Sequence, residues 1–238
     1  MGRAFEFRKA RKMKRWSAMA KTFTRIGKDI VMAVKDGGSS IETNSKLRAV
    51  IQNAKAANMP KDNIERAIKR ASDKSTGNFK EILFEGYGPF GIAIIVETAS
   101  DNNNRTVANI RSYFNKCDGS LATSGSVDFL FDHLCFFQIK DEDIDIEELE
   151  LELIDFGVIE LSKSENEISI TARFEDFGSI QKELERRKLE ISSSELEREA
   201  KINKALPQDE RLKVERLINM IDEDEDVQNV YHDMKTND

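Results

Sequence analysis

The spacing of apolar residues changes once along this chain, and that change limits the fold more than any other feature. Between residues 22 and 73 apolar residues recur at helical spacing, as Ile64 and Ile68 do. From residue 82 onward they form short runs bounded by glycine and polar residues, which predict buried strands. The polar segment 72–78 separates the two patterns and predicts a domain linker. The sequence therefore predicts an α+β protein with a helical part and a sheet-containing part.

The helical part, residues 22–78, is expected to form a small bundle of three helices. The run DGG at 36–38 ends the first helix, the cluster Thr43, Asn44 and Ser45 offers side-chain oxygens to cap the second, and Pro60 begins the third. Residues 1–21 lack this apolar periodicity and are dense in cations. We expect them to form a basic arm that orders on a polyanion, because self-repulsion outweighs the little surface that they could bury.

The sheet-containing part is expected to hold two α+β domains, one inserted in the other. Residues 134–200 have the order strand, helix, strand, strand, helix, strand, which is the ferredoxin-like unit. The flanking stretches 79–133 and 201–238 would together form the second ferredoxin-like domain. Its strands are expected at 82–84, 92–96, 127–131 and 227–231.

The charge of the chain is divided as sharply as its periodicity. Residues 1–74 contain 19 lysines and arginines against 7 acidic residues, while the remainder contains 18 against 37. Such asymmetry is typical of a nucleic-acid-binding part attached to an acidic body. A solvated basic face is the alternative interpretation.

The candidate nucleic-acid-binding residues are the cations of the first 74 residues and one tryptophan. Phosphate binding needs many cations and no special geometry, and an aromatic ring can stack on an exposed base. The candidates are Arg8, Lys9, Arg11, Lys12, Lys14, Arg15, Trp16, Lys21, Arg25, Lys28, Lys61, Arg66, Lys69 and Arg70. Trp16 could instead anchor the arm by packing. The cations from Lys61 onward lie away from the apolar stripe of their helix, free for a ligand or for solvent.

A polar cluster of Asn102, Asn104 and Arg105 precedes an expected helix at 105–116. It is either a second contact surface or the capping chemistry of that helix.

The sequence contains no coherent catalytic constellation. The run GYGPFG at 86–91 matches G-x-G-x-x-G, the dinucleotide-binding pattern. However, it continues into an apolar strand rather than a helix, and Pro89 removes an amide donor, so we interpret it as a tight turn. We therefore expect a protein that is not an enzyme and has no cofactor.

The cysteines and histidines are too scattered to predict a metal site. Cys117 and Cys135 are expected to be reduced core thiols, and His133 and His232 have no motif partner. The acidic run 222–226 lacks the pattern of a calcium-binding loop and is expected to be solvated, or to touch a basic partner. No apolar run approaches the ~18 residues of a membrane span, and no secretory signal is recognisable, so we expect a cytoplasmic protein without a membrane partner.

Several runs resemble the YebC/PmpR family. The run ANMPKDNIERAIKR at 57–70 resembles the family signature, and further runs agree in order: FEGYGP at 84–89, IIVE at 94–97, DN at 101–102, NRT at 104–106, TSGSV at 123–127 and DVQNVYH at 226–232. The resemblance covers nearly the whole chain. One departure is at the start, where family members have a Gly-His-Ser-Lys-Trp-like stretch and this chain has GRAFEFR, with its tryptophan at position 16.

The resemblance implies three domains, the third inserted in the second, and a regulatory role. Bacterial members are described as transcriptional regulators that bind promoter DNA; a mitochondrial relative is a translational activator of cytochrome oxidase, and some bacterial relatives are implicated in assisting ribosomes. Our leading hypothesis is thus a DNA-binding transcriptional regulator. The alternatives are a ribosome-associated translation factor that binds ribosomal or transfer RNA, and a protein-interaction scaffold that uses the acidic domains.

Overall fold

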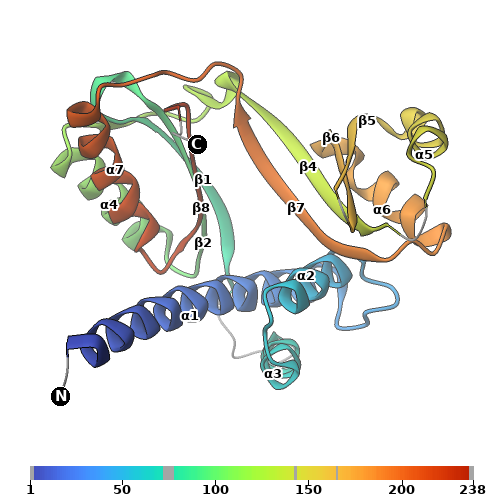
Figure 1. The fold of residues 1–238 in the computed structure, drawn as a ribbon. Coiled ribbons are helices and arrows are strands. Elements are labelled where there is room, and N and C mark those ends of the chain that lie inside the picture. The colour runs from blue at the N-terminus through green and yellow to red at the C-terminus, as the bar shows by residue number, and fades with distance from the viewer. Residues whose placement is uncertain (1–2, 72–77, 142–143, 165, 236–238) are drawn as a thin grey trace. The chain divides into compact units, whose positions relative to one another are not determined.

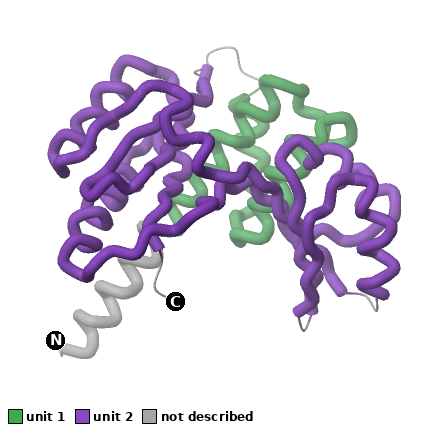
Figure 2. The backbone as a smooth tube through the Cα atoms, turned by 90° about the horizontal axis from the view of Figure 1, so that it is seen from above, with its two compact units in different colours: residues 1–76 green, residues 77–238 purple. Residues whose placement is uncertain are grey.

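A computed structural model describes residues 3–71, 78–141, 144–164 and 166–235, with side chains described from residue 18 onward. The chain divides into two compact units, residues 1–76 and 77–238 (Figures 1 and 2). Apart from Asn78, the expected linker at 72–78 lies outside the described residues.

Three helices form the first unit: α1 (Arg3–Gly37), α2 (Ser45–Ala56) and α3 (Lys61–Ala71). Both α2 and α3 pack on α1. The buried apolar residues of this unit are Ile26, Ile30, Val31, Ala33, Val34, Leu47, Ala49, Ile51, Ala54, Met59, Ile64 and Ala71. Their helical spacing confirms the three helices that periodicity predicts, because each helix buries one apolar stripe.

Asn44 joins the end of α1 to the start of α2. Its Oδ1 accepts a hydrogen bond from the Leu47 amide at 2.9 Å, which confirms the predicted cap. Its Nδ2 donates to the carbonyl oxygens of Ala33 and Gly38 at 2.7 and 2.8 Å. A Cβ at Gly37 would lie 2.7 Å from this Nδ2, so only glycine fits beside the cap.

The first helix begins far earlier than the apolar pattern predicts. It starts at Arg3 rather than near residue 22, so the segment expected as an arm, 1–21, is helical from Arg3 onward. Residues 3–26 contain neither glycine nor proline and are rich in Arg, Lys, Ala and Met, which have high helix propensity. Local propensity thus outweighs the repulsion between neighbouring cations.

The second unit contains two four-stranded sheets. The first has the strand order β3-β1-β2-β8, all antiparallel, with β1 (Lys80–Tyr87), β2 (Ala93–Ser100), β3 (Ser120–Leu121) and β8 (Val227–His232). Helices α4 (Asn103–Lys116) and α7 (Gln208–Asp222) cover one face, where Ile94, Val96, Phe114 and Leu217 are buried (Figure 1).

The second sheet has the order β5-β6-β4-β7, with β4 (Phe131–Lys140), β5 (Val158–Lys163), β6 (Glu167–Arg173) and β7 (Ile191–Ala200). Helices α5 (Ile146–Leu153) and α6 (Phe177–Arg186) pack on one face around a core that includes Phe137 and Ile170. The resulting β-α-β-β-α-β order with antiparallel pairing is ferredoxin-like. The α+β fold class is therefore confirmed.

One expected strand is wrong. Residues 128–130, expected within a strand at 127–131, form a 3-10 turn (Asp128–Leu130) after which β4 begins at Phe131. The third strand of the first sheet is instead β3, which is only two residues long. Val127 and Phe131 are buried as predicted, but they pack on the outer face of that sheet beside Ala93 and Ile95.

Candidate nucleic-acid interface

The most cationic stretch of the chain lies at the start of α1. Residues 8–15 span about two helical turns, roughly 12 Å of axis. The side chains of Arg8, Lys9, Arg11, Lys12, Lys14, Arg15 and Trp16 lie outside those that the structure describes. Their role in binding stays a prediction.

Further along α1 the cations lie next to its buried stripe. Lys21, Arg25 and Lys28 are each half-buried and interact with neighbouring groups, while Ile26 and Ile30 between them belong to the core. These cations therefore stand at the edge of the packed surface rather than on a fully solvated face.

The four cations predicted on α3 are all exposed. Ile64 is buried in the core, so Lys61, Arg66, Lys69 and Arg70 lie away from the packed stripe, as expected. Lys61 is within 3.5 Å of Glu65, but this pair is so exposed that it contributes little to stability. The described side chains thus give α3 an outer surface that is available to a polyanion.

The suggested second surface at residues 102–105 is largely occupied within the fold. The Oδ1 of Asn102 accepts from the Arg105 amide at 3.2 Å and caps α4. The Arg105 guanidinium donates to Asp226 and to Asp101. Only Asn104 of this cluster is exposed without such a role among the described residues.

Two aspartates of the acidic run 222–226 hold α4 against the loop that precedes β8. Besides the Arg105 pair, the Asp226 carboxylate accepts from Ser100 Oγ at 3.0 Å and Thr106 Oγ1 at 2.8 Å, and it is 4% exposed. The expectation of a wholly solvated loop is therefore wrong at this position.

The neighbouring Asp224 makes a second set of contacts with α4. It accepts from Asn109 Nδ2 at 3.0 Å and from the Tyr113 hydroxyl at 2.9 Å. Burial and this hydrogen bond raise the pKa of Tyr113 to about 12. The acidic run is thus partly a structural clamp on α4.

Glu85 anchors the loop that carries the TSGSV run. Its buried carboxylate accepts from the amides of Gly125, Val127 and Asp128 at 2.6, 2.7 and 2.9 Å. Burial alone would raise the pKa of Glu85, but these three backbone donors lower it overall. Sequence reasoning missed this role, because the partners lie about 40 residues away.

Arg198 connects the two sheets of the second unit. From β7 it donates to Glu97 Oε1 on β2 at 3.1 Å and to Asp128 Oδ1 at 2.6 Å, and its side chain is 12% exposed. A mostly buried guanidinium with two carboxylate partners fixes the base of the inserted domain to its host.

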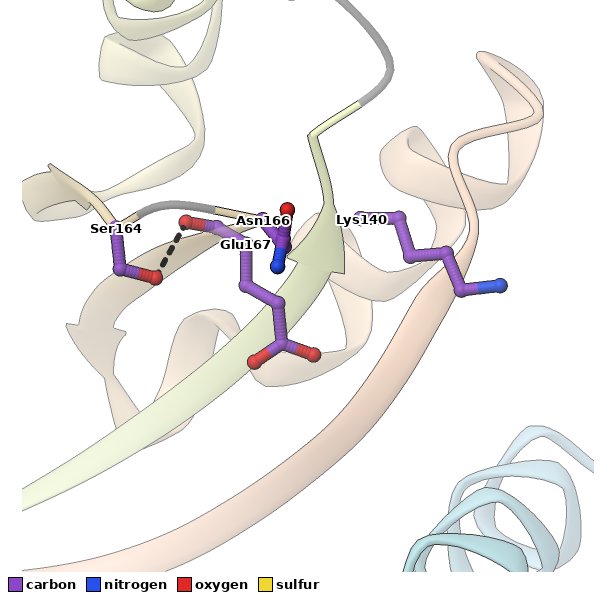
Figure 3. Close-up of a pocket in the computed structure, with 4 residues that line it drawn as sticks. All are labelled: Lys140, Ser164, Asn166 and Glu167. Atoms are coloured by element: carbon purple, nitrogen blue, oxygen red, sulfur yellow. Dashed lines mark hydrogen bonds between the residues drawn. The ribbon is translucent and has the colours of Figure 1, made fainter.

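His133 and Ser164 are both engaged in contacts within the fold. His133 stacks on Phe174 with ring centroids 3.8 Å apart, and burial lowers its pKa. Ser164 lines an open pocket with Lys140, Asn166 and Glu167, but its hydroxyl donates to the Glu167 carbonyl oxygen at 3.1 Å (Figure 3). Within the described ranges no helix is long and apolar enough to cross a membrane.

Comparisons with known proteins agree with this architecture. A "Probable transcriptional regulatory protein" of Flavobacterium johnsoniae is 69% identical over 235 residues, 99% of each chain, and one of Porphyromonas gingivalis is 57% identical over 236 residues, 99% of this chain and 98% of that protein. The crystal structure of a conserved hypothetical protein from Aquifex aeolicus superposes with a TM-score of 0.73 at 31% identity, covering 91% of this chain and 90% of that one.

A helical unit followed by a unit with two antiparallel four-stranded sheets is the fold that this chain shares with the Aquifex aeolicus protein. Family models match almost every residue: the "TACO1/YebC protein N-terminal domain" matches residues 3–74 and the "TACO1/YebC second and third domain" matches residues 79–234. The chain belongs to the TACO1/YebC family.

Proposed function

We propose that this regulatory protein binds nucleic acid through its first unit and acts in the cytoplasm on transcription by binding DNA. The observation that carries the proposal is the segregation of charge, with 19 lysines and arginines against 7 acidic residues in residues 1–74. The names of the relatives, transcriptional regulatory proteins, support the same role.

In this proposal the cations of α1 and α3 neutralise phosphates, and the released counterions provide much of the affinity. The exposed cations Lys61 and Lys69 would contact the phosphate backbone of the nucleic acid directly. The second unit, in which acidic residues outnumber basic ones, would contribute much less to phosphate binding than the first unit does.

Backbone contacts do not distinguish one sequence from another, or duplex DNA from structured RNA. The alternative, a translation factor on ribosomal or transfer RNA, therefore uses the same surface. Cross-linking in intact cells, followed by sequencing of the recovered DNA and RNA, separates the two. Discrete promoter fragments support the DNA proposal, whereas ribosomal RNA recovered from ribosome-preserving buffer overturns it.

The salt dependence of binding tests the surface itself. The double variant Lys61→Ala/Lys69→Ala should reduce the slope of log affinity against log salt by up to about 0.9 for each lost contact on duplex DNA. The triple variant Lys12→Ala/Lys14→Ala/Arg15→Ala should reduce the same slope by up to about 0.9 for each of three lost phosphate contacts. The matched control is Lys80→Ala/Lys182→Ala, which removes two exposed lysines of the second unit. Equal slopes in all four proteins would contradict the proposal.

A further inference from the structure

Phe90 has an unusual backbone for a large side chain. It lies in the 3-10 turn between β1 and β2, Pro89–Gly91, with φ 60° and ψ 19°, the left-handed region. This conformation costs roughly 1–2 kcal/mol for a residue with a Cβ. Asparagine or glycine would adopt this backbone at lower cost, so Phe90 places a large side chain where the backbone does not favour one.

The turn that carries Phe90 is held from several sides. The Gly88 amide donates to the Ile92 carbonyl oxygen at 2.8 Å, and Lys204 Nζ donates to the Gly91 carbonyl oxygen at 2.7 Å. Pro89 is buried. The strained residue therefore sits on a fixed support.

The ring itself is not used to fill the core. Phe90 is 45% exposed, although the surrounding sheet buries most of its apolar side chains. Lys213, an exposed residue of α7, places its Nζ 5.6 Å from the ring centroid. No carboxylate pairs with Lys213 among the described residues, so its charge is available to an anion.

An exposed aromatic ring with an ammonium over one face, in contact with no carboxylate among the described residues, fits one chemistry well. Unpaired bases stack on aromatic side chains whatever their sequence, and cations close to such a ring bind the phosphates of the same strand. We infer that Phe90 and Lys213 form a contact site for an unpaired nucleotide, with the base on the ring and the phosphate at the ammonium. This inference rests on the proposed function and adds to it a recognition of single-stranded nucleic acid by the second unit.

The test compares binding of fluorescein-labelled single-stranded oligonucleotides, RNA and DNA in separate arms, with binding of a duplex of the same sequence. Phe90→Gly removes the ring and accepts the left-handed backbone, so the variant does not fail through strain. We expect it to bind single strands about five- to 100-fold more weakly, with little change for the duplex, and Phe90→Trp to retain binding. Lys213→Ala should also weaken the binding of single strands.

Phe129→Ala is the matched control, because Phe129 is also an exposed aromatic residue of this unit, at 64%, without the strained backbone or the lysine over its ring. Unchanged single-strand binding in Phe90→Gly, or an equal loss in both variants, overturns the inference while the proposed function stands. If the native chain binds no nucleic acid at all, the proposed function fails and the inference falls with it.

Discussion

Arg105 Nη2 lies 2.8 Å from Oδ2 and 3.0 Å from Oδ1 of Asp226, a residue 121 positions away in the chain. The pair joins the start of α4 to the residue before β8. The ion pair therefore connects two segments of the first sheet's domain that lie on either side of β4–β7 in the sequence. Because the Asp226 carboxylate is buried, Arg105, Ser100 and Thr106 compensate the loss of its hydration.

Asp226→Ala should destabilise the second unit by about 2–4 kcal/mol. The substitution leaves the Ser100 and Thr106 hydroxyl groups without their acceptor and removes the partner of Arg105. Urea unfolding followed by circular dichroism measures the change. Glu223→Ala, on an exposed side chain of the same run, should leave the unfolding midpoint unchanged. Equal stability of the two variants would rule out the clamp.

Glu85→Gln should lower the free energy of unfolding by about 1.5–3 kcal/mol at neutral pH, since a charged acceptor of three amides is replaced by a neutral one. The native pKa of Glu85 is lowered, so its stabilisation is present above the unfolded pKa and is lost as pH falls through the folded one. The difference in unfolding free energy between native and variant proteins should therefore shrink as the pH falls below the ordinary glutamate pKa of 4.5 and then through the lowered pKa of Glu85. A gap that stays constant with pH would contradict this role, and Glu160→Gln is the exposed control.

Neither thiol should react with iodoacetamide in the native protein at about pH 8. Burial, with a smaller effect of Asp176, raises the pKa of Cys135 to about 12, and its Sγ donates to the Arg173 carbonyl oxygen at 3.3 Å. Cys117 is buried against Met220. Mass spectrometry should find two labels after denaturation and none before. Native labelling of Cys135 would show that the core around β4 opens readily.

Gly27→Ala should stabilise the helical unit by about 0.5–1 kcal/mol. Gly27 lies inside α1, and an added Cβ meets nothing within 4 Å. Thermal unfolding monitored by helix ellipticity gives the measurement. Gly37→Ala in the same helix should be destabilising, because its Cβ would approach Asn44 Nδ2 at 2.7 Å. Destabilisation by both changes would mean that α1 is not packed as described.

The sequence predicts most of this fold because its elements bury regular apolar stripes. The strands predicted at 92–96 and 134–139 are confirmed as β2 and β4, and the helix predicted at 209–221 is confirmed as α7. The cap at Asn44 falls within the predicted capping cluster 43–45, because a cap and the amide that it accepts from lie only three residues apart. The start of α1 was missed because polar residues give no stripe to detect, although their propensity favours a helix.

The parts that sequence reasoning missed depend on partners far along the chain. The turn at Asp128–Leu130 exists because Glu85 accepts the amides of Val127 and Asp128, which no local pattern reveals. The contacts of Asp224 and Asp226 with α4 could be predicted only if the position of β8 in the sheet were known. Their one local signal was the alternation of Asp224 and Asp226 directly before an expected strand.

The inserted domain leaves and re-enters its host through β4 and β7, which pair from Phe131 opposite Ala200 to Ile139 opposite Ile191. Entrance and exit are thus the two arms of one ribbon, already adjacent at their base. The second sheet is thus bounded by one antiparallel ribbon, and Arg198 on β7 ties the base of that ribbon to Glu97 on β2. The chain therefore forms a complete second sheet between β3 and β8 without interrupting any strand of the first sheet.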